Sequence, residues 1–234
     1  MRRVWAAVML AGVASAAAAA PRMAGFAAIA AGAERLDMTG VGWGRSGRFK
    51  LGAASGTFRR DLDRRRSGRG VALVEHAGGL AFEVAGAEMR GLLRGECGLE
   101  QAQERAWAGA LSVSTAVDPM RLRCAFSLDG RPAGELVLDA AFQRRASVET
   151  RRAGTVRVGG AELAIRSVHR FEGSRWPTSD PLGYVLERDG RAVAAVDVNG
   201  ARKRLAVPRA GAERDATLAA GVALALFWDP GDQD

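Results

Sequence analysis

The chain has 234 residues, of which 48% are hydrophobic and 26% charged, and its formal net charge at pH 7 is +8. This length suits one domain with a core of ordinary size. The positive charge favours an anionic partner such as lipid or an acidic envelope polymer, whereas the small aromatic fraction, 6%, argues against nucleic acid.

The N-terminus has the pattern of an export signal. Arg2 and Arg3 precede an uncharged, apolar run that ends in small residues at Ala20. A positive start, an apolar middle and a small-residue end are typical of a secretory signal peptide. We therefore expect a signal peptide over 1–20, an apolar segment or linker over 21–36, and a periplasmic or secreted protein. The alternative is an uncleaved N-terminal membrane anchor.

Short alternating segments separated by turn dipeptides fill the middle of the chain. In Leu122–Leu128, for example, Leu122, Cys124 and Phe126 share one face of a predicted strand, as a half-buried strand requires. Two-residue hairpin turns need positive φ, which glycine and asparagine tolerate. The sequence predicts about twelve antiparallel strands in one meander over 37–234. The predicted turns lie at Gly78-Gly79, Asp129-Gly130, Gly159-Gly160, Asp189-Gly190 and Asn199-Gly200.

The two cysteines are predicted to form a disulfide. Cys97 is in phase with Leu93, and Cys124 is in phase with Phe126, so both thiols point to the apolar face of their strands. In an oxidising compartment, an isolated pair of this kind usually forms one bridge. The alternative is two buried free thiols. A metal or redox role is not expected, because there is no Cys-x-x-Cys motif and the chain has two histidines.

A helix of unusual composition is predicted at about 213–228. Glu213 and Asp215 suit its positive end, and the stretch DATLAAGVALALFW is apolar on every side. A helix that is apolar all round must be enclosed, and this one is shorter than the roughly 20 residues that a bilayer requires. The simplest enclosure is a sheet that wraps around it. The fold class is therefore a mostly β, single antiparallel barrel around a C-terminal helix.

The stretches YVLERDGRAVAAVDVNG and ERDATLAAGVALALFWDP carry a resemblance to a known family. A strand pair followed by an apolar helix of this kind resembles the tubby-like fold, which includes the tubby, LURP-one-related and phospholipid-scramblase domains. The resemblance of plan extends over Met38 to Asp229. It implies a closed barrel of about twelve strands around one hydrophobic helix. It also implies a role at lipid or membrane surfaces.

The loop near His169 is the first candidate site. His169, Asp180 and one of three serines are candidates for a Ser–His–Asp arrangement, although no nucleophile elbow is present. Arg175 and Trp176 in the same loop are candidates for binding a sugar or a lipid headgroup, since long loops on a rigid scaffold often carry recognition. The interpretation that we favour is structural: we expect Trp176 to plug one end of the barrel. The three serines are Ser167, Ser174 and Ser179.

An arginine-rich stretch is the second candidate site. We expect it to be a solvated, exposed loop, since Asp61 and Asp63 weaken its local field, and contact with an anionic surface is its candidate role. His76, just before a predicted turn, is expected to be structural. The arginines are Arg59, Arg60, Arg64, Arg65, Arg66 and Arg69.

The function expected from these features is non-enzymatic binding of lipid or another anionic amphiphile at the barrel surface or rim. The first alternative is a structural or partner-binding periplasmic protein with no small ligand, and a remote alternative is a hydrolase. An outer-membrane barrel is disfavoured because aromatic girdles are missing. We expect a monomer and no cofactor.

Overall fold

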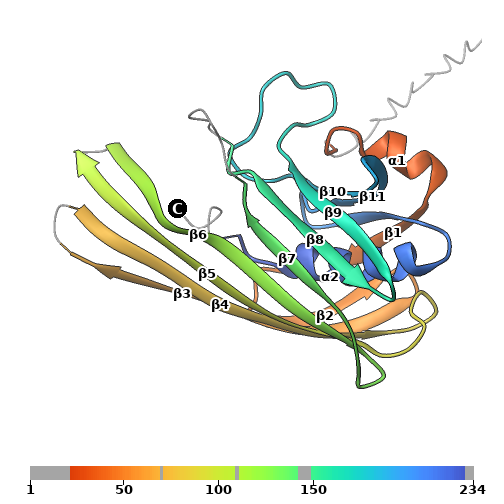
Figure 1. Ribbon diagram of the computed structural model, residues 1–234. Helices are drawn as coiled ribbons and strands as arrows, with labels where there is room; N and C mark the ends of the chain where they lie inside the picture. The colour runs from red at the N-terminus through yellow and green to blue at the C-terminus, as the bar shows by residue number, and fades with distance from the viewer. Residues whose placement is uncertain (1–21, 69–70, 109–110, 142–148, 230–234) are drawn as a thin grey trace, which may run out of the picture.

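The computed structural model describes residues 22–68, 71–108, 111–141 and 149–229. Within these ranges the chain forms two helices and a closed barrel of twelve strands (Figure 1). The helices are α1 (Phe26–Gly32) and α2 (Ala212–Leu226). The strands are β1 (Glu34–Thr39), β2 (Ser46–Leu51), β3 (Ala54–Ser67), β4 (Val71–Ala85), β5 (Leu93–Ala108), β6 (Leu111–Leu128), β7 (Arg131–Ala140), β8 (Arg152–Val158), β9 (Ala161–Val168), β10 (Gly183–Arg188), β11 (Arg191–Asp197) and β12 (Lys203–Val207).

The barrel is an antiparallel meander that closes between its first and last strands. Each strand pairs with its neighbours in sequence, and β1 pairs with β12 from Glu34 opposite Val207 to Met38 opposite Lys203. The predicted fold class is confirmed. The barrel begins at Glu34, inside the segment 21–36 that the sequence assigned to a linker, because β1 supplies the pairing that closes the sheet. The predicted signal peptide, 1–20, lies outside the described residues.

Three of the five predicted two-residue turns are confirmed, while Asn199-Gly200 lies in the longer connection 198–202 and the prediction at Gly78-Gly79 is wrong. Gly78 and Gly79 lie inside β4, paired with Leu62 and Asp61 of β3. Neither has the positive φ that a two-residue turn needs, whereas Gly160 has φ 83°. A Cβ on Gly78 would lie 2.4 Å from the carbonyl oxygen of Asp61. The glycine therefore allows β3 and β4 to approach each other closely.

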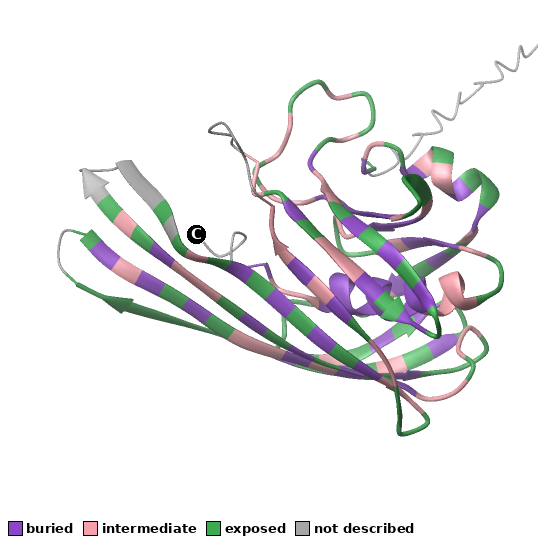
Figure 2. Cartoon of the chain, viewed as in Figure 1, coloured by how far each residue is buried: buried purple, intermediate pink, exposed green. Residues whose placement is uncertain are grey.

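Helix α2 lies inside the barrel, and every residue from Ala216 to Leu226 is buried (Figures 1 and 2). The many alanines and Gly221 let the wall come close, since a Cβ at Gly221 would lie 2.5 Å from Leu205 Cδ2 of β12. The helix ends at Leu226, two residues before the predicted end. Phe227 is extended, with ψ 136°, and leads the chain to the barrel end.

Helix α1 packs on the outside of the barrel. Phe26 and Ala30 contact a second apolar cluster that includes Val185 and Ala195, which point outward from β10 and β11. These strands are therefore buried on both faces, which explains their nearly continuous apolar sequence. Among the residues that the structure describes, neither helix is long and apolar enough to cross a membrane.

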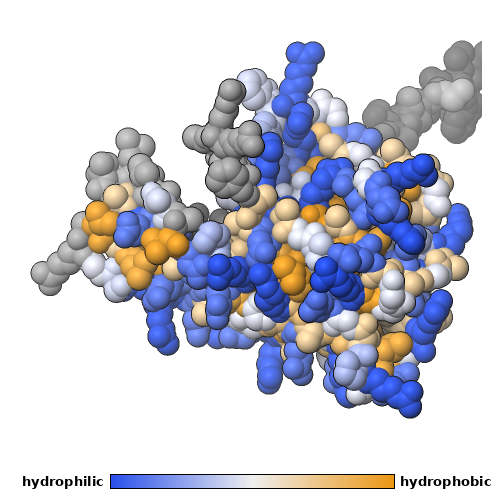
Figure 3. Space-filling view, viewed as in Figure 1, coloured by the Kyte–Doolittle hydropathy of each residue, from blue (hydrophilic) through white to orange (hydrophobic). Residues whose placement is uncertain are grey.

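Strands β3 to β6 are long, with 14, 15, 16 and 18 residues, and they project beyond the barrel (Figure 1). Figure 3 shows hydrophobic side chains on this projection, where Val71 and Val117 are exposed. The arginine-rich stretch lies on β3, so the prediction of an exposed loop is wrong. In the described chain β2 pairs with β3 only as far as Arg59, which leaves the following residues at a free edge. Charged side chains protect such an edge from unwanted pairing.

The predicted disulfide is confirmed. Cys97 of β5 and Cys124 of β6 lie directly opposite each other and are bonded, with a separation of 27 residues in the chain. Both face the core, where they are 8% and 4% exposed. In the chain-entropy account, closing a loop of this length stabilises the fold by about 3–4 kcal/mol.

Candidate functional site

One end of the barrel, here called the mouth, consists of residues 40–45, 169–182, 198–202 and 227–229. These segments surround a cavity of about 720 Å³. Ligand pockets usually measure about 300–1,000 Å³ and combine apolar walls with a few polar groups. Here the aromatic wall consists of Trp43, Tyr184, Phe227 and Trp228, and the polar groups include Lys203 and Asp180.

Arg60 forms part of the floor of the mouth. Its Nη1 donates a hydrogen bond of 2.7 Å to the carbonyl oxygen of Leu226 at the end of α2, and Nε and Nη2 donate to the carbonyl oxygens of Gly44 and Gly42. Its guanidinium also stacks 4.3 Å from the ring centroid of Trp228. Burial lowers the pKa of Arg60 to about 10, so it stays charged at neutral pH. The prediction that Arg60 lies in an exposed loop is therefore wrong. Arg60 is buried, caps the last carbonyl of α2 and anchors the 40–45 loop by hydrogen bonds.

A buried ion pair crosses the wall of the mouth. Arg152 of β8 donates from Nη2 and Nε to Asp229 Oδ1 and Oδ2 at 2.8 and 3.1 Å, and the two side chains are 5% and 7% exposed. Burial alone would lower the pKa of Arg152, but the charge and hydrogen bonds of Asp229 outweigh it and the pKa is raised. The pair fixes the chain that leaves α2 to the barrel wall.

His169 is buried and hydrogen-bonded at both ring nitrogens. Nδ1 lies 3.2 Å from the carbonyl oxygen of Thr178, and Nε2 lies 2.9 Å from Ser167 Oγ. A carbonyl oxygen only accepts, so we assign the proton to Nδ1, and Nε2 then accepts from the hydroxyl of Ser167. Burial lowers the pKa of His169, which favours the neutral ring near pH 7.

The predicted Ser–His–Asp set is assembled only in part. Ser174 donates to the carbonyl oxygen of Trp176, and Ser179 donates to Asp180 Oδ2 at 3.0 Å. The ring nitrogen of His169 that would meet an aspartate meets the carbonyl of Thr178 instead. The site therefore holds a serine–histidine pair whose orienting group is a backbone carbonyl.

Two tryptophans of the mouth point into solvent. Trp43 is 85% exposed and Trp176 is 82% exposed, on loops from distant parts of the sequence. The expectation that Trp176 plugs the barrel is wrong, because α2 fills the interior and Trp228 with Arg60 covers its end. Figure 1 shows the loop that carries Trp176 rising above β9. Sequence reasoning missed Trp43, whose signal is its place between two glycines in a turn-like stretch.

Four exposed arginines belong to the loops that carry these tryptophans or are bonded to them. Arg45 belongs to the 40–45 loop, Arg170 and Arg175 belong to the 169–182 loop, and the backbone of Arg22 is bonded to Glu172 of that loop. Within the described chain, none of the four makes an ion pair. Their charges are thus available to an anionic ligand.

The other predicted arginines do not form one cluster. On β3 successive side chains alternate between the two faces, so Arg59 and Arg65 lie on the outer face, while Arg64 and Arg66 lie on the inner face of the projection. Arg69 lies outside the described residues. His76, also on the inner face, is 2% exposed, which agrees with its expected structural role.

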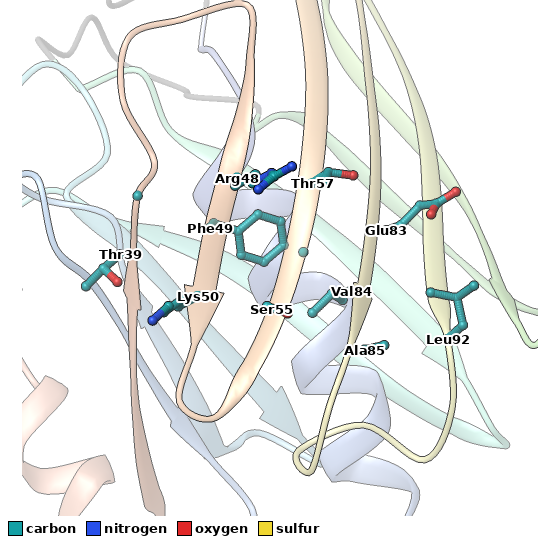
Figure 4. Close-up of a pocket in the computed structure, with 12 residues that line it drawn as sticks. Thr39, Arg48, Phe49, Lys50, Ser55, Thr57, Glu83, Val84, Ala85 and Leu92 are labelled. Carbon is teal, nitrogen blue, oxygen red and sulfur yellow. The ribbon is translucent and has the colours of Figure 1, made fainter.

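A second hollow, of about 800 Å³, lies over β1 to β4 (Figure 4). The charged side chains that line it, Arg48, Lys50 and Glu83, are all exposed and carry both signs. Phe49 and Val84 also line it but belong to the core. We regard it as a trough in the outer wall and assign no site to it.

The described residues contain no group of three or more His, Cys, Asp and Glu side chains that could hold a metal ion. Comparison of the chain with protein-family models, curated proteins and solved structures gave no match. The fold itself, a closed antiparallel barrel with a C-terminal helix, is compatible with the barrel that the tubby-like resemblance implies.

Proposed function

We propose that the protein binds anionic lipid, or another anionic amphiphile, through the mouth of the barrel. The observation that carries this proposal is the exposure of Trp43 and Trp176 at the same end. A tryptophan side chain in contact with protein or lipid buries about 150–250 Å² of its surface. Two tryptophans that stay in water therefore do not contribute this burial to the stability of the fold. Tryptophan favours membrane interfaces, where its apolar body is buried and its N–H stays hydrated.

The charge of the mouth supports an anionic rather than a neutral ligand. Arg22, Arg45, Arg170 and Arg175 are exposed, and the 169–182 loop has two acidic residues, Glu172 and Asp180. A basic side chain near an anionic lipid surface contributes about 1 kcal/mol. Because this attraction is screened within about 10 Å at 0.1 M salt, binding should weaken as salt is added.

The proposal includes the setting of the protein. An export signal over 1–20 and membership of the tubby-like group both fit a role at an envelope lipid surface, in the periplasm or outside the cell. The apolar start of the chain supports export, and the helix-filled barrel supports the fold relationship. A retained N-terminal anchor is the alternative, and it would place the mouth near the same surface.

Vesicle sedimentation tests the proposal. We expect the protein to bind vesicles containing phosphatidylglycerol in a salt-sensitive way and to bind pure phosphatidylcholine weakly. Replacing both Trp43 and Trp176 by alanine should weaken binding at least tenfold. Arg175→Glu should weaken it by about 30-fold, since charge reversal costs about twice the contribution of one arginine.

Arg191→Glu is the matched control, because it makes the same charge change on an exposed residue at the other end of the barrel. It should leave binding nearly unchanged. Binding that is independent of lipid charge, or that survives loss of both tryptophans, would contradict the proposal.

A second candidate function, ester hydrolysis, rests on the hydrogen bond between Ser167 and His169. Ser167 Oγ would attack the carbonyl carbon while its proton passes to Nε2 of His169, which would return the proton to the departing alkoxide. Water would then release the acyl group from the serine. The neutral form of His169 is the one that this step needs.

A fluorophosphonate probe, which labels nucleophilic serines, tests this candidate. If it is right, the purified protein is labelled at Ser167, Ser167→Ala and His169→Ala abolish labelling, and Ser174→Ala does not. An unlabelled wild-type protein, or a label on another serine, would rule it out.

A further inference from the structure

A smaller cavity, here called the rear cavity, lies at the end of the barrel opposite the mouth. Its volume is about 320 Å³, near the lower bound for ligand pockets. It lies between the first turns of α2 and the connections β4–β5, β6–β7 and β8–β9. Its apolar wall consists of Met89, Leu93, Leu128, Pro132, Val158 and Leu218.

Two irregular backbone positions lie in the wall of the rear cavity. The pairing of β6 with β7 shifts register between Phe126 and Ser127, so Ala133 has no partner on β6 and the start of β7 bulges. Across the cavity, β8 turns into β9 at Gly159, whose φ is 60°. Ala133 and Gly159 both line the cavity together with Leu218 of α2. A cavity lined by such side chains binds water poorly and favours an apolar occupant.

The rear cavity is lined by two arginines and one aspartate, so one positive charge is not balanced there. Arg90 pairs with Asp215 at 3.4 Å, which neutralises the carboxylate that lines the cavity. Arg131 is exposed and makes no ion pair with any residue that the structure describes. The N-terminal end of α2, which begins at Ala212, adds a partial positive charge. An anionic group there would therefore be favoured.

We propose that the rear cavity binds the alkyl chain of a single-chain amphiphile, with its small anionic headgroup, such as a carboxylate, paired with Arg131. Each methylene that leaves water contributes about 0.8 kcal/mol, so the chain supplies most of the affinity and the headgroup sets the orientation. The cavity volume suits one short chain and excludes a two-chain lipid. This site is separate from the mouth and does not depend on the function proposed there.

Titration of the full chain with sodium decanoate, below its micelle concentration, tests the proposal by calorimetry. We expect saturable binding of one decanoate. Leu128→Trp, which fills the cavity from a half-buried position, should abolish binding. Arg131→Ala should weaken binding by about tenfold, and Arg131→Lys should restore part of the loss, since lysine keeps the charge.

Three controls separate this site from the mouth and from a folding defect. Thermal unfolding of Leu128→Trp should stay cooperative. Trp176→Ala should bind decanoate as the wild type does, and Arg131→Ala should sediment with anionic vesicles as the wild type does. Absence of saturable decanoate binding, or binding that Leu128→Trp leaves intact, would overturn the proposal. Equally tight binding of decan-1-ol would overturn the role of Arg131.

Discussion

Val222→Asp is expected to abolish folding at neutral pH. Val222 lies at the middle of α2 and is 0% exposed, with Leu218 and Leu226 one turn away on the same stripe, at 1% and 0%. An unpaired carboxylate in such surroundings costs several kcal/mol, which is most of the total stability of about 5–15 kcal/mol of a typical domain. Circular dichroism during urea titration should show no cooperative transition.

Two further variants make this test quantitative. Leu218→Ala removes apolar volume without adding charge, and it should lower the free energy of unfolding by about 2–5 kcal/mol. Ala210→Asp introduces the same carboxylate at an exposed position before the helix and should change stability by less than about 0.5 kcal/mol. A Val222→Asp protein as stable as Ala210→Asp would show that α2 is not enclosed.

Asp229→Ala is expected to lower the free energy of unfolding by about 3–5 kcal/mol. The substitution leaves Arg152, whose side chain is 5% exposed, with its charge buried and without the carboxylate that accepts two of its hydrogen bonds. The loss arises chiefly from this stranded charge rather than from the attraction between the partners. Urea unfolding of the variant and the wild type measures it.

The exposed pair of Arg123 and Asp139 provides the matched control. These residues lie 2.7 Å apart but are 48% and 41% exposed. Asp139→Ala should therefore cost less than about 1 kcal/mol. Replacing Arg152 and Asp229 together by apolar residues should recover much of the loss. Equal effects of Asp229→Ala and Asp139→Ala would contradict the burial of the Arg152 pair.

The sequence predicted those features that depend on local pattern. Alternation along Leu122–Leu128 indicated a half-buried strand, and the continuous apolar run after Ala216 indicated an enclosed helix. The phase of Cys97 and Cys124 with apolar residues of their own strands placed both thiols on the core face, where they are bonded. Each inference needed only the side-chain period of one element and the requirement that apolar faces be covered.

The errors arose where partners distant in sequence decide the outcome. Gly78-Gly79 and Gly159-Gly160 are the same dipeptide, yet the first continues a strand because β3 and β5 pair across it. Trp176 was expected to close the barrel, but Trp228 arrives there from the end of α2. Which segment pairs with a strand or covers the barrel end depends on both segments, so it cannot be predicted from the sequence of one of them.

The candidate sites were harder to predict than the fold for the same reason. Trp176 and Arg175 attracted attention because they share one loop, whereas Trp43 joins them only because β1 and β9 end at the same side of the barrel. Arg60 was grouped with its arginine neighbours, although its guanidinium reaches the carbonyl of Leu226, far along the chain. The rear cavity is likewise assembled from separate turns and the start of α2.

Hydrogen exchange of the full-length protein, free and on anionic vesicles, tests most directly whether the mouth is the surface that meets lipid. We expect vesicles to slow exchange in residues 40–45 and 169–182, and to leave the turns at Gly130, Gly160 and Gly190 at the other end unchanged. Protection concentrated at those turns, or on the projecting ends of β3 to β6, would contradict the account. So would identical exchange in the two states.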